Sequence, residues 1–282
     1  MTSAVHYWQT TRFRIDLATP RVMGIVNLTP DSFSDGGAHG GHLSGLAHCE
    51  RLVAEGADIL DLGGESTRPG APEVGIAEEL DRVMPVLEGA LALGVPVSVD
   101  TRKPEVMRAV LAAGADIVND VNALRSPGAI DAVAAHPSCG ICLMHMHGTP
   151  QTMQQRPAYA DVVDEVLGFL RVRCEALVQA GVAADRVVVD PGIGFGKSVE
   201  HNLELLRRQE ELCAIGRPLL LGWSRKSTLG AVTGREVGDR LAASLAAALI
   251  AVQRGASIVR VHDVAPTVDV LKVWRQIHGV RG

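Results

Sequence analysis

Apolar and polar positions along the chain repeat one unit about eight times: a short apolar run, a polar loop and a segment with helical spacing. The apolar runs are rich in β-branched residues and do not alternate with polar ones, which is typical of strands covered on both faces. They predict strands at residues 22–26, 59–62, 95–99, 117–118, 141–146, 187–189, 219–221 and 258–261.

Between these runs the apolar spacing predicts helices, and a glycine follows several of them, at positions 56, 94, 114, 181 and 255, as helix C-termini prefer. The predicted helices cover residues 43–55, 76–93, 105–113, 129–135, 159–180, 199–215, 237–254 and 264–278. Eight strand–helix units favour an α/β fold of the (β/α)8 TIM-barrel type, with a doubly wound open sheet as the alternative. We predict one barrel domain, residues 21–282, after an N-terminal leader, residues 1–20, with a short β-hairpin around residues 13–17.

Composition narrows the class of protein. The 282 residues are 47% apolar and 21% charged, as in a globular protein. Only 3% are aromatic and the net charge is −5, which argues against a nucleic-acid binder. The N-terminus has no apolar signal-peptide core, and the longest apolar run, residues 241–252, is too short to span a bilayer. We therefore expect a cytoplasmic protein without nucleic-acid or membrane partners.

The five cysteines are an odd number, which indicates reduced thiols rather than a disulfide framework. Cys139 and Cys142, with His145 and His147, have a spacing that resembles a metal cluster. Because residues 140–146 are predicted to form a strand, Cys142 and His145 should point to opposite faces. We therefore expect these cysteines to be buried by ordinary packing.

Each predicted strand ends on a group that binds or ionises. In a TIM barrel such positions converge on one mouth, whereas any one of them alone could simply cap a helix or hold a turn. Capping does not account for a set that includes lysine, arginine and histidine. The series is Asn27, Asp61, Asp100, Asn119, His145, Asp190, then Lys226, Arg260 and His262.

The chemistry of this series is mixed. Asp100, Asn119 and Asp190 suit a flat heterocycle with an amidine-like edge, because a carboxylate accepts two parallel N–H donors. Arg260, His262, Arg68 and Lys226 supply positive charge for an anion, and Asn27 offers a neutral oxygen that suits Mg²⁺. This composition indicates a ligand with a ring at one end and a phosphate ester at the other.

The glycine-rich segment 190–197, DPGIGFGK, fits neither a Walker A loop nor a dinucleotide fingerprint. We expect its glycines to bring backbone close to a flat ligand, with Phe195 available for stacking and Lys197 as a solvated loop charge. Ser227, beside Lys226, is either part of a carboxylate-binding site at a helix N-terminus or an N-cap, and its spacing does not decide between the two.

Eight segments of the chain resemble the dihydropteroate synthase family, and together they span nearly all of it from Arg21 onward. They are GIVNLTPDSFSDGG (24–37), DLGGESTRPG (61–70), VSVDTRKP (97–104), IVNDV (117–121), MHMHGTPQTMQ (144–154), DPGIGFGK (190–197), GWSRKS (222–227) and IVRVHDV (258–264). The resemblance implies condensation of 6-hydroxymethyl-7,8-dihydropterin diphosphate with 4-aminobenzoate, giving 7,8-dihydropteroate and diphosphate. It also implies a requirement for Mg²⁺, a homodimer and sensitivity to sulfonamides.

The resemblance assigns roles by position. It implies pterin binding by Asp100, Asn119, Met144, Asp190 and Lys226, and diphosphate binding by Thr67, Arg260, His262 and, through Mg²⁺, Asn27. Phe33, Pro69, Phe195, Lys226 and Ser227 would frame the aminobenzoate. Asp35 and Arg68, on two mobile loops, and Lys226 would be catalytic.

Loss of diphosphate from an electron-rich dihydropterin favours an SN1-like path, in which the cations stabilise the leaving group. The arylamine is itself the nucleophile, so none is needed from the protein. The competing hypotheses are a corrinoid-dependent, pterin-binding methyltransferase barrel and a non-catalytic pterin-binding paralogue.

Overall fold

A closed barrel of eight parallel strands forms the centre of the molecule in a computed structural model, which describes residues 6–29, 37–68, 70–148, 153 and 157–279. The barrel closes because β10 pairs with both β3 and β9. Its strands are β3 (Arg21–Asn27), β4 (Ile59–Gly63), β5 (Val97–Asp100), β6 (Ile117–Asp120), β7 (Gly140–Met144), β8 (Val187–Asp190), β9 (Leu219–Leu221) and β10 (Ala256–Val261). The predicted TIM barrel is confirmed, and its closure excludes the open sheet.

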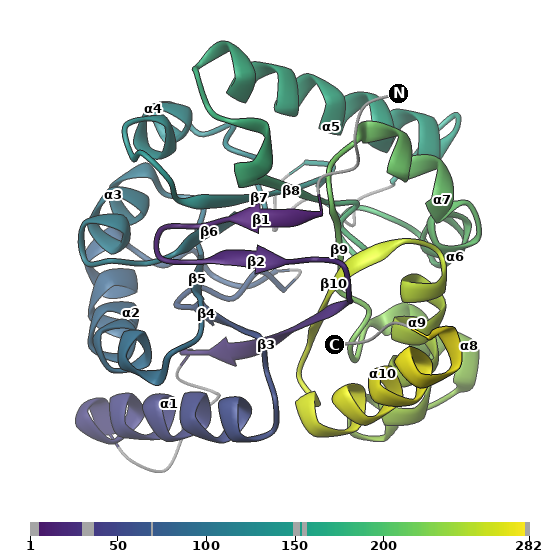
Figure 1. Cartoon of the computed structure of the whole chain (residues 1–282), viewed down its shortest axis with the longest axis horizontal. Coiled ribbons are helices and arrows are strands. Elements are labelled where there is room, and N and C mark those ends of the chain that lie inside the picture. The colour runs from purple at the N-terminus through teal and green to yellow at the C-terminus, as the bar shows by residue number, and fades with distance from the viewer. Residues whose placement is uncertain (1–5, 30–36, 69, 149–152, 154–156, 280–282) are drawn as a thin grey trace.

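Helices surround the barrel (Figure 1). They are α1 (Gly37–Ala54), α2 (Ile76–Ala90), α3 (Pro104–Ala112), α4 (Ala129–Ala134), α5 (Val162–Gln179), α6 (Val199–Arg207), α7 (Gln209–Leu212), α8 (Ser227–Thr233), α9 (Leu241–Gln253) and α10 (Val264–His278). Short 3-10 turns are η2 (Leu91–Leu93), η3 (Ala184–Arg186), η4 (Cys213–Ile215) and η5 (Val237–Asp239). All five glycines predicted to end helices have positive φ, so they adopt the left-handed conformation that glycine permits. No helix among the described residues is long and apolar enough to cross a membrane.

Several predictions of element bounds were wrong. The predicted helix 43–55 begins earlier, at Gly37, the predicted strand 141–146 ends at Met144, and the predicted helix 199–215 is interrupted at Arg208. The helix α8 was not predicted. Arg208 leaves helical geometry with φ −106° and ψ 20°, and its guanidinium binds Asp161 and Glu211. A local interruption of this kind preserves the apolar spacing of the segment, so the spacing did not reveal it.

The N-terminal hairpin, β1 (Tyr7–Gln9) and β2 (Arg14–Asp16), covers the end of the barrel that faces the viewer in Figure 1. The hairpin is confirmed, although its turn precedes the predicted position. Trp8 is fully buried, and its indole N–H donates to the carbonyl of Arg186 over 2.9 Å. Apolar side chains from the barrel interior, among them Met23, Ile59 and Ile117, pack beneath the hairpin in one cluster.

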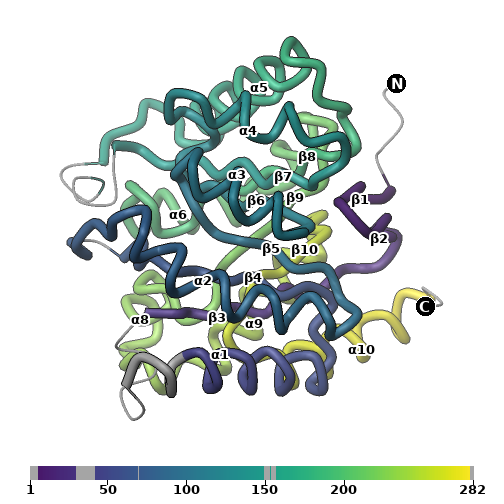
Figure 2. The backbone as a smooth tube through the Cα atoms, turned by 90° about the vertical axis from the view of Figure 1, so that its left-hand side faces the viewer, coloured from purple at the N-terminus to yellow at the C-terminus, as the bar shows by residue number. Residues whose placement is uncertain are grey.

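Two larger apolar clusters fill the layer between the strands and the helices. Figure 2 shows the helices stacked along the side of the barrel, with the hairpin at one edge of the view. Because the hairpin fills one end of the barrel, a ligand has access from the opposite end, where the strands terminate.

Candidate active site

The carboxyl ends of neighbouring strands bring the predicted polar residues into adjacent positions. Asp100 pairs with Asn119 in the register of β5 and β6, and Met144 pairs with Asp190 in that of β7 and β8. Asn27 ends β3 opposite Gly63. The convergence expected from the sequence is therefore present for these residues.

Asp61 is the centre of a buried hydrogen-bond network. Its Oδ2 accepts from Nε of Arg260 over 2.6 Å and from Nδ2 of Asn119 over 3.1 Å. Arg260 also donates from Nη2 to Oδ2 of Asp100 over 3.1 Å. The Asp61 side chain is fully buried, and sequence reasoning placed it among the strand-end residues without giving it a role. Asp61 thus binds two residues that were predicted to bind different parts of the ligand, and Arg260 connects it to Asp100.

This network fixes the orientation of Asn119. A carboxylate only accepts hydrogen bonds, so the amide of Asn119 must direct its NH₂ group at Asp61 and leave its oxygen for another partner. Burial raises the pKa of Asp100 to about 8, although the charge of Arg260 opposes this rise. An amide oxygen and a buried carboxyl group are therefore adjacent, and both can accept from an N–H-bearing edge.

Asp190 and Lys226 form the neighbouring part of the site. Oδ1 of Asp190 accepts the backbone N–H of Gly192 over 2.7 Å, while burial raises the pKa of this carboxyl group. Lys226 lies with Nζ 4.2 Å from the ring centroid of Phe195, which is cation–π geometry. Burial and then Arg260 lower the pKa of Lys226 to about 8, and the two carboxylates Asp190 and Asp100 limit the decrease.

His262 is held in one orientation by Ser224. The backbone N–H of His262 donates to Ser224 Oγ over 3.1 Å, and that hydroxyl lies 3.0 Å from Nδ1 of His262. Burial and the charge of Arg260 lower the pKa of His262 to about 3, so the ring is neutral. In the tautomer in which Ser224 donates to Nδ1, Nε2 carries the proton and is a donor for an anion.

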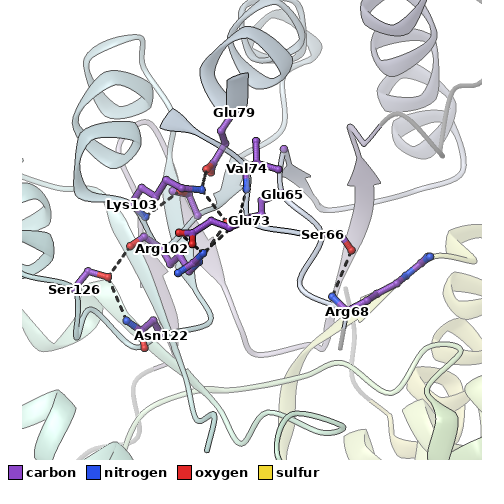
Figure 3. Close-up of polar contacts among 12 residues, drawn as sticks. Glu65, Ser66, Arg68, Glu73, Val74, Glu79, Arg102, Lys103, Asn122 and Ser126 are labelled. Carbon is purple, nitrogen blue, oxygen red and sulfur yellow. Dashed lines mark hydrogen bonds and ion pairs between the residues drawn. The ribbon is translucent and has the colours of Figure 1, made fainter. Parts of the chain in front are cut away.

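The β4–α2 loop has an anchored stem and an exposed tip (Figure 3). Glu65 accepts the backbone N–H of Val74 over 3.0 Å and closes the loop, and it also accepts from Lys103 Nζ over 2.8 Å. Arg102 lies 3.3 Å from Glu65 and 2.8 Å from Glu73. Burial opposes the charge of Glu65, but Lys103 and Arg102 outweigh it and lower its pKa. The stem is thus tied to the loop that follows Asp100.

The tip of this loop carries Thr67, which is half-buried, and Arg68, which is exposed. Figure 3 shows the Arg68 side chain directed away from the Glu65 cluster. Pro69 lies outside the described residues, as do Phe33 and Asp35, so the roles assigned to these three stay predictions.

Two predicted placements were wrong. Lys197 is buried, at 3% exposure, and donates to Nδ1 of His145 over 2.9 Å. His145 does not join the other strand-end residues, because its ring packs against Phe169 on α5 at a centroid distance of 4.9 Å. Because side chains alternate between the two faces here, Cys142 lies inside the barrel and His145, three residues later, points outward.

The cysteines near His145 are buried, as predicted. Cys142 lies in the cluster inside the barrel and Cys139 in the layer beneath the helices. Cys142 and His145 therefore occupy opposite sides of the strand wall, and these cysteines are packing residues.

Comparison with known proteins identifies the family. A family model of pterin-binding enzymes matches residues 23–262. A dihydropteroate synthase from Neisseria meningitidis serogroup B is 53% identical over 97% of this chain and 98% of that protein. The chain belongs to the dihydropteroate synthase family.

Solved structures of dihydropteroate synthases have the same fold. The enzyme from Xanthomonas albilineans with 4-aminobenzoic acid is 54% identical, with a TM-score of 0.90 over 95% of this chain and 96% of that one. The enzyme from Burkholderia cenocepacia complexed with 7,8-dihydropteroate is 53% identical, with a TM-score of 0.89 over 97% and 96%. A Yersinia pestis dihydropteroate synthase with a sulfonamide drug complex is 43% identical, with a TM-score of 0.92 over 97% and 100%.

Ser227 was predicted either to cap a helix or to bind the carboxylate of a dihydropteroate synthase ligand. Ser227 is exposed and is the first residue of α8, while Lys226 is its N-cap, with no side-chain capping bond. The capping alternative for Ser227 is therefore wrong, which leaves its hydroxyl for a ligand.

The Mg²⁺ expected for this family has one candidate protein ligand on the described strands. Asn27 ends β3 half-buried, and within the described residues its side chain has no hydrogen-bond partner. No group of three or more histidine, cysteine, aspartate or glutamate residues in that part of the chain is arranged to hold a metal. One neutral oxygen fits Mg²⁺ that retains waters and takes phosphate oxygens from a substrate.

Proposed function

We propose that this chain condenses 6-hydroxymethyl-7,8-dihydropterin diphosphate with 4-aminobenzoate to give 7,8-dihydropteroate and diphosphate. The observation that carries the proposal is the buried array of Asp100, Asn119 and Asp190 beside Lys226, in a chain of this family. It places acceptors for the N–H groups of a pterin next to cations that suit its diphosphate.

The pterin is bound by groups whose orientations are already fixed. Asn119 offers its amide oxygen because its NH₂ group is bound to Asp61. Asp100 and Asp190 accept N–H donors, and Lys226 donates to a ring acceptor. Met144, which pairs with Asp190 and is 4% exposed, lines the ring. Preorganised donors and acceptors reduce the free energy that ordering would otherwise cost on binding.

The diphosphate is bound by Thr67, Arg260, His262 and Asn27. Arg260 retains 21% exposure although it pairs with two carboxylates, and neutral His262 donates from Nε2. Mg²⁺ held by Asn27 would neutralise charge on the leaving diphosphate. Donors aimed at oxygens that gain charge as the C–O bond breaks lower the barrier of an SN1-like substitution.

The aminobenzoate is framed by Phe195, Ser227, Phe33 and Pro69, with Lys226 between it and the pterin. The cation–π contact between Lys226 and Phe195 joins the two substrate sites. The amine attacks the electron-deficient methylene carbon without a protein nucleophile. Asp35 stabilises the developing pterin cation, and Arg68 closes over the leaving group.

One assay tests the reaction. Purified protein is supplied with pterin diphosphate, 4-aminobenzoate and Mg²⁺, and dihydropteroate and diphosphate are quantified. We expect both products in equal amounts, and none without aminobenzoate. Micromolar binding of pterin without product would overturn the proposal in favour of a non-catalytic pterin binder, and methyl transfer from a methylated pterin would favour the methyltransferase alternative.

We also propose that the chain is a homodimer. Several exposed apolar side chains lie on α8, η5, α9 and α10, and α9 packs against both α8 and α10. Val232, Val237, Leu241, Val273 and Ile277 are 42% to 74% exposed. Exposed apolar side chains on neighbouring helices are typical of a subunit interface.

The cytoplasmic location stays a prediction.

The dimer proposal is tested by light scattering after gel filtration. We expect a mass twice that of the chain, and a monomer for Val273→Glu. Val178→Glu, on the distant helix α5, is the matched control because Val178 is 53% exposed. A monomeric wild type would contradict the proposal.

A further inference from the structure

The β8–α6 loop carries Phe195 and follows Asp190, and it is packed backbone to backbone against the segment after β7. Two glycines allow this approach. A Cβ at Gly192 would lie 1.9 Å from the carbonyl oxygen of His145, and one at Gly196 would lie 2.8 Å from Cβ of His147. Both have positive φ, 70° and 63°, so any other residue would be strained at either position.

Lys197 fastens these two segments together from the inside. Its ammonium group donates to Nδ1 of His145 over 2.9 Å, and to the carbonyl oxygens of Gly192 and Phe195 over 3.0 and 3.1 Å. The carbonyl oxygen of His145 is a fourth acceptor at 3.3 Å. One cation thus donates to acceptors on both segments, and of these the carbonyl oxygen of Gly192 also accepts the backbone N–H of Phe195 over 3.1 Å.

The cost of burying this cation indicates a specific role. Among the described residues no carboxylate forms an ion pair with Lys197, whose side chain is 3% exposed. A buried charge without an ion-pair partner is unfavourable, and burial lowers the pKa of Lys197 to about 7. An apolar residue of similar size would fill this volume without that penalty, but it would not hold the carbonyl groups in place.

The position of Phe195 depends on the hydrogen bonds that Lys197 donates to His145, Gly192 and Phe195, which we call the Lys197 clamp. Its carbonyl oxygen accepts from Lys197, its ring packs with Met144 and Met146, and the same ring contacts Lys226. A second bond on the same loop runs from the hydroxyl of Tyr159 to the carbonyl oxygen of Gly196 over 2.8 Å. The loop is therefore held by two independent hydrogen-bond donors, the buried and charged Lys197 and the neutral hydroxyl of Tyr159.

We propose that Lys197 is a positioning residue that fixes Phe195 against Lys226 and thereby sets the affinity for 4-aminobenzoate. The inference rests on the proposed assignment of Phe195 to the aminobenzoate site. Asp190 lies on strand β8, which is held by the barrel ladder, so pterin affinity depends less on the clamp. The two substrates should consequently respond differently when Lys197 is replaced.

Lys197→Met removes the ammonium group and keeps the length of the chain. We expect the KM for aminobenzoate to rise roughly ten-fold, while kcat and the pterin Kd each change less than about three-fold, because the loss is one of ground-state positioning. Lys272→Met, at an exposed lysine on α10, is the control for the loss of one positive charge. A lowered Tm with an unchanged KM would show a structural role only and would overturn the proposal.

Lys197→Gln, which keeps a hydrogen-bond donor without the charge, decides the role of Lys197 if Lys197→Met does not fold, and Tyr159→Phe tests the second hydrogen bond to the same loop. We expect a rise of about three-fold in the aminobenzoate KM, as for one neutral hydrogen bond. Phe195→Ala separates the assignment of Phe195 from the role of Lys197. An unchanged KM in Phe195→Ala would refute the assignment of Phe195. A raised KM in Phe195→Ala, with the wild-type KM in Lys197→Met and in Tyr159→Phe, would refute the role of Lys197 alone.

Discussion

The strand ends and the β4–α2 loop contribute to the same mouth of the barrel, but they hold their residues in opposite ways. Asp61, Asp100, Asn119 and Arg260 are joined by three hydrogen bonds in the interior. Arg68 is exposed at the tip of a loop whose stem alone is anchored. The fixed group suits recognition of a rigid heterocycle, and the exposed one suits a group that approaches as charge develops on the leaving diphosphate.

Removing the centre of the fixed network should have the largest effect. Asp61→Ala leaves Arg260 without its closest carboxylate and Asn119 without its acceptor, and we expect a loss of about 3 kcal/mol in the free energy of unfolding. Urea unfolding measures this loss. Asp61→Asn should cost less because an acceptor remains, and an equal cost for both would show that volume rather than hydrogen bonding dominates.

Replacing a ligand-facing carboxylate should affect binding instead. We expect Asp190→Ala to weaken pterin binding by about 100-fold, as for the loss of charge-assisted hydrogen bonds. Isothermal titration with the pterin measures this change, and Asp269→Ala, at an exposed aspartate of α10, is the control. Retained affinity in Asp190→Ala would refute the role of Asp190 in pterin binding.

The loop residues should show the reverse pattern. We expect Arg68→Ala to lower kcat by about ten-fold while the unfolding free energy changes by less than about 0.5 kcal/mol. Asp35→Ala should likewise reduce turnover far more than pterin affinity. Steady-state kinetics and pterin titration on the same preparations test both variants. Collapse of pterin binding in either would remove the distinction between the fixed and the exposed groups.

The last prediction concerns the pH dependence of stability. The pKa of His262 is about 3 in the folded chain and near 6.5 when unfolded, so the unfolded state binds more protons between these values. The contribution of His262 to stability is therefore present above pH 6.5 and is lost as the pH falls, by up to about 1.4 kcal/mol per pH unit. Urea unfolding at pH 7, 6 and 5 should give a flatter dependence for His262→Gln. The same dependence of the unfolding free energy on pH in the wild type and in His262→Gln would mean that His262 is not a buried neutral ring.

The barrel and the position of its site could be predicted from local patterns. Buried strands are short and apolar, and parallel strands necessarily bring residues such as Asp100, Asn119 and Asp190 to one end. The role of Asp61 was missed because Arg260, its main partner, lies 199 residues away across the barrel. The buried position of Lys197 was missed because its partners are mostly backbone carbonyl groups. Every residue has such a group, so the sequence does not indicate which of them accept from Lys197.

Trp8 and the hairpin around it give the barrel a single open end. Both substrates and both products must therefore travel by one route. The hairpin, far from the strand-end residues, thus makes substrates and products share the opening at the other end of the barrel.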